Sequence, residues 1–258
     1  MWNRKELKAR GKAAFKANYW RCVLVAFILT LLAGAIGGAA GGTTSSSYTN
    51  QQQQIQEQLQ SGGPIVIGEQ TFESVEDFLE NGPTNTVGAV LGIIAGVIAA
   101  VGIIGLLLNI FIFNPLAVGC QRFFAENSSS PARLGEMGYG FKNGYGRVVG
   151  AMLLQDIFLF LWTLLFIIPG IIKLYAYRMV PYILAEEPEL SGTAVITRSR
   201  QMMKGHKWKA FVLDLSFILW YLLSAVTCGI VGIFYVYPYV YATNAELYHE
   251  LRRLESAA

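Results

Sequence analysis

Residues 148–168 read VVGAMLLQDIFLFLWTLLFII and are followed directly by Pro169-Gly170. This run is long enough to cross a bilayer as one helix, because about 20 apolar residues span the hydrocarbon core. A helix does not pass smoothly through a Pro-Gly pair, so we expect a turn or kink at Pro169 and Gly170. The stretch therefore predicts a membrane span that ends in a sharp change of direction.

The whole chain has the composition of a membrane protein. Of its 258 residues, 53% are apolar and 14% are charged, whereas charged residues make up about 25% of soluble proteins. The mean hydropathy is +0.42. These values exclude a disordered chain, a coiled coil and a disulfide scaffold, and they argue against an ordinary soluble enzyme.

Further apolar segments extend the first span to an all-α, polytopic membrane protein with six transmembrane helices. The predicted spans cover residues 22–41, 87–113, 148–168, 171–185, 210–226 and 230–244. Segment 171–185 is short, and the positive-inside rule decides whether it crosses. If it crosses, eighteen of the 20 Lys and Arg residues lie on the cytoplasmic side or at its boundary. We therefore expect a bacterial plasma-membrane protein with both termini in the cytoplasm.

The spans divide the chain into three predicted regions. Residues 1–21 form a basic interfacial helix, and residues 22–124 form a first hairpin with an extracellular polar insertion at 43–86 that contains no Lys or Arg. Residues 125–258 form two more hairpins, with a cytoplasmic amphipathic helix at 191–207 and a C-terminal tail. A cleaved signal peptide is the alternative for the N-terminus, but the long charged region favours an uncleaved first span.

An internal repeat connects these regions. Arg10-x-Lys12-x3-Lys16-x3-Trp20 precedes the first span, and Arg198-x-Arg200-x3-Lys204-x3-Trp208 precedes the fifth at identical spacing. We predict three parallel hairpin repeats, each with a basic interfacial helix and a late proline in its second helix. The alternative is chance recurrence of residues that are common in membrane proteins. The expected hinges or kinks are Pro115, Pro169, Gly170, Pro181 and Pro238.

The basic helices predict contact with anionic lipid headgroups. Lysines near a membrane surface attract anionic lipids, and tryptophans favour the interface. The candidate headgroup residues are Lys12, Lys16, Trp20, Lys204, Lys207 and Trp208.

Three charged residues are predicted to lie inside the bilayer in one layer near its cytoplasmic face. They are Asp156, Arg178 and Asp214. An intramembrane charge is costly and is usually paired or functional. Two readings stay open: a structural ion pair that fixes helix register, and a proton, ion or headgroup site.

Glycines spaced four apart give two predicted spans a flat face. They are Gly34, Gly38, Gly88, Gly92 and Gly96. Such faces allow close helix contact. Packing of the first span against the second is the favoured interpretation, and a homodimer or a membrane partner is the alternative.

Nothing in the sequence indicates a catalytic, metal or cofactor site. The chain lacks GxSxG, HExxH and phosphate-loop motifs, and its only histidines are His206 and His249. The three cysteines have no partners at metal-binding spacing. The basic residues follow membrane topology rather than a nucleic-acid surface, so no nucleic-acid partner is expected. We expect a protein that is not an enzyme.

Two stretches carry a resemblance to a known family. They are LFIIPGIIK at 165–173 and SRQMMKGHKW at 199–208, together with Asn18-Tyr19-Trp20. They resemble uncharacterised integral membrane proteins, found mainly in Gram-positive bacteria and defined by a domain of unknown function. They are also distantly similar to the membrane domain of some glycerophosphodiester phosphodiesterases, without the catalytic domain. The resemblance implies membrane location and fold, and no functional residues.

The leading functional hypothesis is a non-enzymatic membrane protein. It would engage anionic lipid headgroups or a membrane partner, in envelope homeostasis. The alternative is a small permease or a lipid or peptide exporter that uses the intramembrane Asp/Arg layer.

Overall fold

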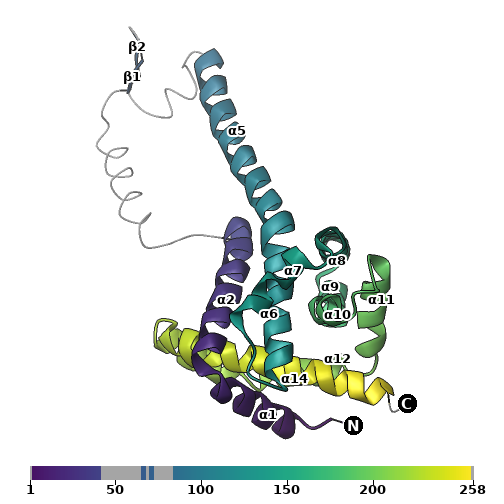
Figure 1. Ribbon diagram of the computed structural model, residues 1–258. Helices are drawn as coiled ribbons and strands as arrows, with labels where there is room; N and C mark the ends of the chain where they lie inside the picture. Colours follow the sequence, from purple (N-terminus) through teal and green to yellow (C-terminus); the bar gives the residue numbers. More distant parts are fainter. Residues whose placement is uncertain (1, 42–64, 68–69, 73–83, 257–258) are drawn as a thin grey trace. The chain divides into compact units, whose positions relative to one another are not determined.

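A computed structural model describes residues 2–41, 65–67, 70–72 and 84–256 (Figure 1). Contacts divide the chain into two units, one made of Met1–Gly34 and Leu107–Ala258 and the other of Ala35–Leu106. The described residues are helical except for one short hairpin, so the fold is all-α.

The unit Ala35–Leu106 holds the end of α2, a small hairpin and most of α5. The strands are antiparallel and pair Ile65 with Phe72 and Ile67 with Gln70. Most of the predicted insertion at 43–86 lies outside the described residues, as do the surroundings of Gly34, Gly38 and Gly88. The bounds in this unit are α2 (Tyr19–Gly41), β1 (Ile65–Ile67), β2 (Gln70–Phe72) and α5 (Thr84–Leu108).

In the larger unit, α1 (Arg4–Ala17) meets α2 at a sharp bend. The side chain of Asn3 caps α1 by accepting a 2.9 Å hydrogen bond from the backbone N–H of Lys5. Asn18 leaves helical geometry at the other end of α1. The helix axes then turn by 107°. A polar helix that ends in such a turn before an apolar helix fits an interfacial helix followed by a membrane span.

Two further helices carry a proline as their second residue, directly after a π-helical turn. The turn Asn109–Phe113 precedes α6 (Asn114–Asn127), and the turn Gly232–Val236 precedes α14 (Tyr237–Ser256). Pro115 and Pro238 are the second residues of these helices. Because proline has no N–H, it interrupts the regular hydrogen-bond pattern of the preceding turn.

The turn after the third predicted span differs from the expected position. Helix α8 ends at Leu165, and the extended residue Phe166 separates it from α9. Pro169 and Gly170 therefore lie in the first turn of α9 rather than in the break itself, a position that suits proline. A Cβ on Gly170 would lie 2.7 Å from the Oγ1 of Thr163, so glycine lets α9 pack tightly against α8.

The next helices follow in short segments. A 3₁₀ turn, Leu134–Gly138, and α7 (Tyr139–Lys142) precede α8 (Tyr145–Leu165), α9 (Ile167–Tyr177) and α10 (Val180–Glu186). They are followed by α11 (Thr193–Met202), α12 (Lys207–Leu215) and α13 (Ile218–Val226). The predicted helix at 191–207 is thus shorter, because the chain turns at Gly205 with φ of +79°. Pro181 is the second residue of α10, directly after a break at Arg178 and Met179.

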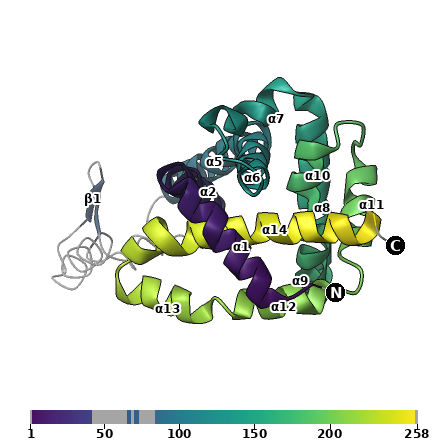
Figure 2. The same ribbon diagram turned by 60° about the horizontal axis from the view of Figure 1, so that its bottom comes forward.

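The core of this unit is built around α14. Figure 2 shows α1 crossing α14, and the two helices approach closely at Gly11 and Thr243. A Cβ on Gly11 would lie 2.8 Å from the Cα of Thr243, so only glycine allows this crossing. Arg10 on α1 binds Glu246 at 3.2 Å and Glu250 at 3.0 Å on α14. These contacts hold the basic helix against the C-terminal helix.

Several described helices are long and apolar enough to cross a membrane. By length and composition there are four, or five if the bent pair α1–α2 is one span. The four are Ala95–Asn127, Tyr145–Leu165, Ile167–Glu186 and Lys207–Val226. Large apolar side chains are exposed on the second half of α8, the first half of α9 and on α13. A surface of this kind is suited to lipid, so the protein is a multi-pass membrane protein.

Candidate functional site

Arg178 and Asp214 form a bidentate ion pair between two segments that are long and apolar enough to cross a membrane. The two guanidinium nitrogens Nη1 and Nη2 each donate a 2.8 Å hydrogen bond to a different carboxylate oxygen of Asp214. Asn244 accepts a further bond from Arg178 at 2.7 Å, and the hydroxyl of Tyr175 donates to Asp214 at 2.8 Å. All charged groups of this cluster are therefore satisfied by one another.

Asp156 lies apart from that pair. Its Oδ2 accepts a 2.8 Å hydrogen bond from the side-chain amide of Asn114, at the start of α6. No cation forms an ion pair with Asp156 among the residues that the structure describes. The structure thus brings Arg178 and Asp214 together and places Asp156 at a separate α6–α8 contact.

The predicted headgroup residues on α1 and α2 lie at the surface. Lys12 and Lys16 are exposed, and Trp20 exposes 72% of its surface. Lys5 shares this stripe because positions 5, 12 and 16 fall on one side of a helix. Two other basic residues of α1 bind protein groups: Arg10 binds α14, and Lys8 donates to the carbonyl and hydroxyl of Ser216 at 3.2 Å.

The predicted residues around α12 are arranged similarly. Lys204 is exposed, Lys207 is half-buried and Trp208 exposes 73% of its surface. The Trp208 ring stacks on Phe211 with 5.2 Å between centroids. This packing fixes an exposed indole at the start of α12.

A pocket joins α1 to α12 beside Trp208. Its volume is about 460 Å³, and it is lined by Trp2, Asn3, Arg4, Trp208, Lys209 and Val212. We call it the α1–α12 pocket. It presents two cations and two indoles, and its lining contains no carboxylate. Phosphate oxygens suit guanidinium and ammonium donors, and indoles suit the boundary between headgroup and acyl chain.

Trp2 is held in this pocket by His206. The indole N–H of Trp2 donates to Nδ1 of His206 at 3.1 Å, and the Lys209 ammonium lies 5.9 Å from the Trp2 ring centroid. Burial, Lys209 and the N-terminal amine lower the pKa of His206. The neutral imidazole therefore accepts the Trp2 bond near neutral pH.

Burial and Arg4 similarly lower the pKa of Lys8, which lies on the same helix as the pocket residue Arg4. Both pKa shifts arise first from burial, and the neighbouring positive charges add to them. An anion in the α1–α12 pocket would reduce the repulsion between these charges.

Sequence reasoning missed Trp2, Arg4 and Lys209. Trp208 marked one side of the pocket, but residues 2 and 4 reach it only through the crossing of α1 over α14. Lys209 directly follows Trp208, and this position beside a predicted headgroup residue was the one feature of the sequence that could have identified it.

Nothing in the described part of the chain indicates a metal centre. No group of three His, Cys, Asp or Glu side chains suited to a metal ion occurs there. Cys22 and Cys120 are buried, Cys228 is exposed, and all three are free thiols.

One family model, described as a protein of unknown function (DUF975), matches residues 1–255. No curated protein matches the chain, and no solved structure matches it.

Proposed function

Because the chain belongs to the DUF975 family of proteins of unknown function, we propose a function from its own geometry. The protein is a non-enzymatic integral membrane protein of the bacterial plasma membrane that engages anionic lipid headgroups. The α1–α12 pocket is the observation that supports this function. Its role would lie in envelope homeostasis, alone or with a membrane partner.

The pocket suits a phosphodiester at the membrane surface for two reasons. Arg4 and Lys209 supply cations from two different helices, so their separation is fixed by the fold. Trp2 and Trp208 supply apolar walls for the glycerol and upper acyl carbons. The exposed lysines Lys12, Lys16 and Lys204 would add a weaker and less specific attraction, worth about 1 kcal/mol each.

The proposed topology has six spans with cytoplasmic termini. Five correspond to the segments long enough to cross, counting α1–α2 as one. The sixth runs from Ile230 through the π-helical turn into the start of α14. Because α14 is amphipathic, this segment is not recognised as a span by its composition. The three parallel hairpin repeats belong to the same proposal, as does packing of the first span against the second through their glycine faces. A homodimer or a membrane partner at the same glycines is the alternative.

The test measures phosphatidylglycerol binding to the purified protein by native mass spectrometry. The pocket variant is Arg4→Gln with Lys209→Gln, and the matched control is Arg133→Gln with Lys142→Gln. Both remove two exposed or half-buried positive charges, but the control charges lie outside the pocket. We expect the pocket variant to bind about tenfold more weakly, with the control close to wild type. Equal losses in both variants, or no loss in either, would contradict a specific pocket.

Salt provides a second check on the same proposal. Attraction between exposed charges weakens over a Debye length of about 8 Å at 0.15 M ionic strength. Phosphatidylglycerol binding is therefore expected to fall with added salt in the wild type and to fall less steeply in the pocket variant.

A permease or exporter is the second candidate function. Asp156 supports it, because among the described residues the amide of Asn114 is the one side chain that binds this carboxylate between α6 and α8. Arg178 and Asp214 argue less for transport, because they satisfy each other. Loss of substrate flux in a folded Asp156→Asn variant would favour this candidate over the headgroup protein.

A further inference from the structure

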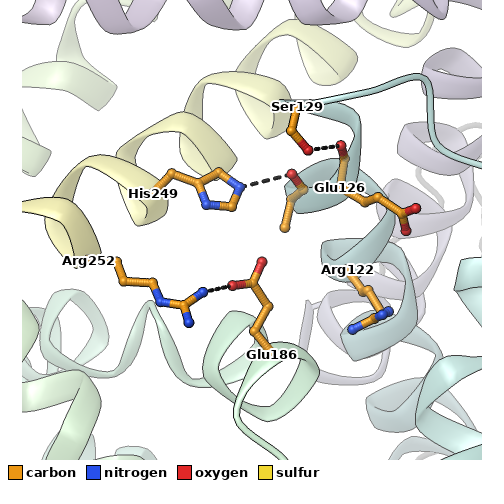
Figure 3. A pocket seen from close by; sticks show the side chains of 7 residues that line it. Arg122, Glu126, Ser129, Glu186, His249 and Arg252 are labelled. Atoms are coloured by element: carbon orange, nitrogen blue, oxygen red, sulfur yellow. Dashed lines mark hydrogen bonds and ion pairs between the residues drawn. The ribbon is translucent and has the colours of Figure 1, made fainter.

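A second pocket lies between α6, α10 and α14, away from the α1–α12 pocket. Its volume is about 290 Å³. The lining residues are Arg122, Ala125, Glu126, Ser129, Glu186, His249 and Arg252. Figure 3 shows His249 and Arg252 projecting from α14, Glu186 from α10, and Arg122 and Glu126 from α6. We call it the α6–α14 pocket.

The charges of this pocket are balanced. The lining includes two guanidinium groups, on Arg122 and Arg252, and two carboxylates, on Glu126 and Glu186. A simple anion would meet repulsion from the carboxylates, and a simple cation would meet repulsion from the guanidinium groups. The pocket therefore suits a ligand that carries both charges.

Part of each arginine is already engaged, which fixes its position. Arg122 donates through Nε to Glu136 at 2.7 Å and through Nη1 to the carbonyl of Ala185 at 2.6 Å. Arg252 donates through Nη1 to Glu186, which also accepts from the hydroxyl of Tyr248. In the described residues, Nη2 of both arginines has no hydrogen-bond partner, so each keeps donors for an oxyanion.

The remaining groups are acceptors. His249 contacts the carbonyl of Ala125 through Nε2 at 2.9 Å, and a carbonyl only accepts, so Nε2 carries the proton. In the neutral ring Nδ1 is then an acceptor. Oε1 of Glu186 and the carboxylate of Glu126 have no hydrogen-bond partner within the described residues. These acceptors match the three donors of a primary ammonium group.

We propose that the α6–α14 pocket binds a small zwitterion that carries one primary ammonium group and one oxyanion. The oxyanion interacts with Arg122 and Arg252, and the ammonium group interacts with the acceptors of Glu126, Glu186 and His249. Such a group occurs on free amino-phosphate compounds and on the ethanolamine headgroup of phospholipids. This proposal is independent of anionic lipid binding at the α1–α12 pocket.

The test uses O-phosphoethanolamine as the probe and the full-length protein in detergent. Binding is measured by isothermal calorimetry, with inorganic phosphate alone and ethanolamine alone as the single-charge comparisons. We expect O-phosphoethanolamine to bind and the single-charge probes to bind at least about tenfold more weakly, because each lacks one set of charge-assisted hydrogen bonds. If inorganic phosphate binds as tightly as O-phosphoethanolamine, the proposal that the pocket selects a zwitterion is overturned.

The variant Arg252→Gln removes one donor from the pocket, and Arg253→Gln is its matched control. Arg253 is the next residue and carries the same charge, but it binds Glu250 outside the pocket. Glu186 keeps its bond from Tyr248 in the Arg252→Gln variant, so the fold is expected to persist. We expect about tenfold weaker probe binding for Arg252→Gln and no change for Arg253→Gln. Equal changes in probe binding for the two variants would overturn the assignment of the site to this pocket.

A last comparison distinguishes the two sources of the ligand. The protein is prepared in micelles that contain either phosphatidylethanolamine or phosphatidylcholine. Phosphatidylcholine is the control, because its quaternary ammonium group has no N–H donor. Arg252-dependent retention of phosphatidylethanolamine alone assigns the pocket to a lipid headgroup, and Arg252-dependent binding of the soluble probe alone assigns it to a free compound. Absence of both, at millimolar probe, would overturn the proposal.

Discussion

The hydroxyl of Tyr145 donates a 2.7 Å hydrogen bond to the carbonyl of Phe111, four residues before Pro115. Because proline has no N–H, that carbonyl lacks the partner it would have in a continuous helix. Tyr19 makes the same kind of contact with the carbonyl of Phe234, four residues before Pro238, at 3.0 Å. In both places, a tyrosine at the start of another helix donates to the carbonyl that the proline leaves without a backbone partner.

Removing either tyrosine hydroxyl is expected to destabilise the protein. Tyr19→Phe and Tyr145→Phe each remove one hydrogen bond to an exposed carbonyl, whose net contribution is about 0.5–1.5 kcal/mol. Tyr221→Phe is the control, because no hydrogen bond of the Tyr221 hydroxyl is found in the described residues. Unfolding of the three variants in detergent, followed by circular dichroism, measures the differences. Equal stability of all three would show that water or other groups satisfy the two carbonyls.

Asp156 and Asp214, the two aspartates predicted to lie inside the bilayer, are expected to respond differently to amide substitution. Asp214→Asn leaves the Arg178 guanidinium without its counter-charge, at a cost of about 3 kcal/mol. Asp156→Asn keeps a partner for Asn114 and removes an unpaired carboxylate, so it is expected to be neutral or stabilising. Thermal unfolding of the two purified variants makes the comparison. A larger loss for Asp156→Asn would mean that its charge has a partner of its own.

The Trp2–His206 contact is expected to weaken in acid. The pKa of His206 is lowered in the folded protein by burial, Lys209 and the N-terminal amine, so the folded state binds fewer protons than the unfolded state. The contribution of this contact is therefore complete above the unfolded pKa of about 6.5 and declines as pH falls below it. Protonation of Nδ1 also removes the acceptor that Trp2 uses.

The variant His206→Asn isolates this effect, because its amide oxygen replaces Nδ1 as an acceptor and does not titrate. The stability difference between wild type and variant, measured across pH 5–8 by thermal unfolding, is expected to shift against the wild type as pH falls. A constant difference across this range would show that His206 binds protons equally in the folded and unfolded chains, which would contradict a pKa lowered by folding.

Cys228 is a natural probe of membrane topology. It is exposed in the turn after α13, whereas Cys22 and Cys120 are buried. In the six-span topology this turn faces outward, so a membrane-impermeant maleimide is expected to label intact cells once per chain. The Cys228→Ser variant should lose the label. Labelling that requires permeabilised cells would place the turn in the cytoplasm and contradict the topology.

Much of the helix pattern follows from local sequence. The apolar run at 148–168 predicted a span, and the structure has α8 at Tyr145–Leu165, shifted by three residues because Phe166 and not Pro169 breaks the helix. Prolines at 115, 181 and 238 were expected to interrupt helices, and each lies directly after an irregular turn. These features depend on a few neighbouring residues, so periodicity and proline chemistry are sufficient.

The candidate sites depend on contacts that local sequence does not contain. Counting residues along a helix gave Asp156, Arg178 and Asp214 a similar depth, but depth does not fix the direction in which a side chain points. Arg178 faces Asp214, and Asp156 faces Asn114. The α1–α12 pocket joins residues that are more than 200 positions apart, because Gly11 allows α1 to cross α14. No spacing rule predicts such a crossing.

A crystal structure from a lipid phase doped with phosphatidylglycerol tests lipid binding at the α1–α12 pocket most directly. We expect headgroup density with a phosphate within hydrogen-bond distance of Arg4 and Lys209 and with carbon atoms against Trp208. Ordered phosphatidylglycerol elsewhere on the protein, with only solvent in a pocket that is open to lipid, would contradict it.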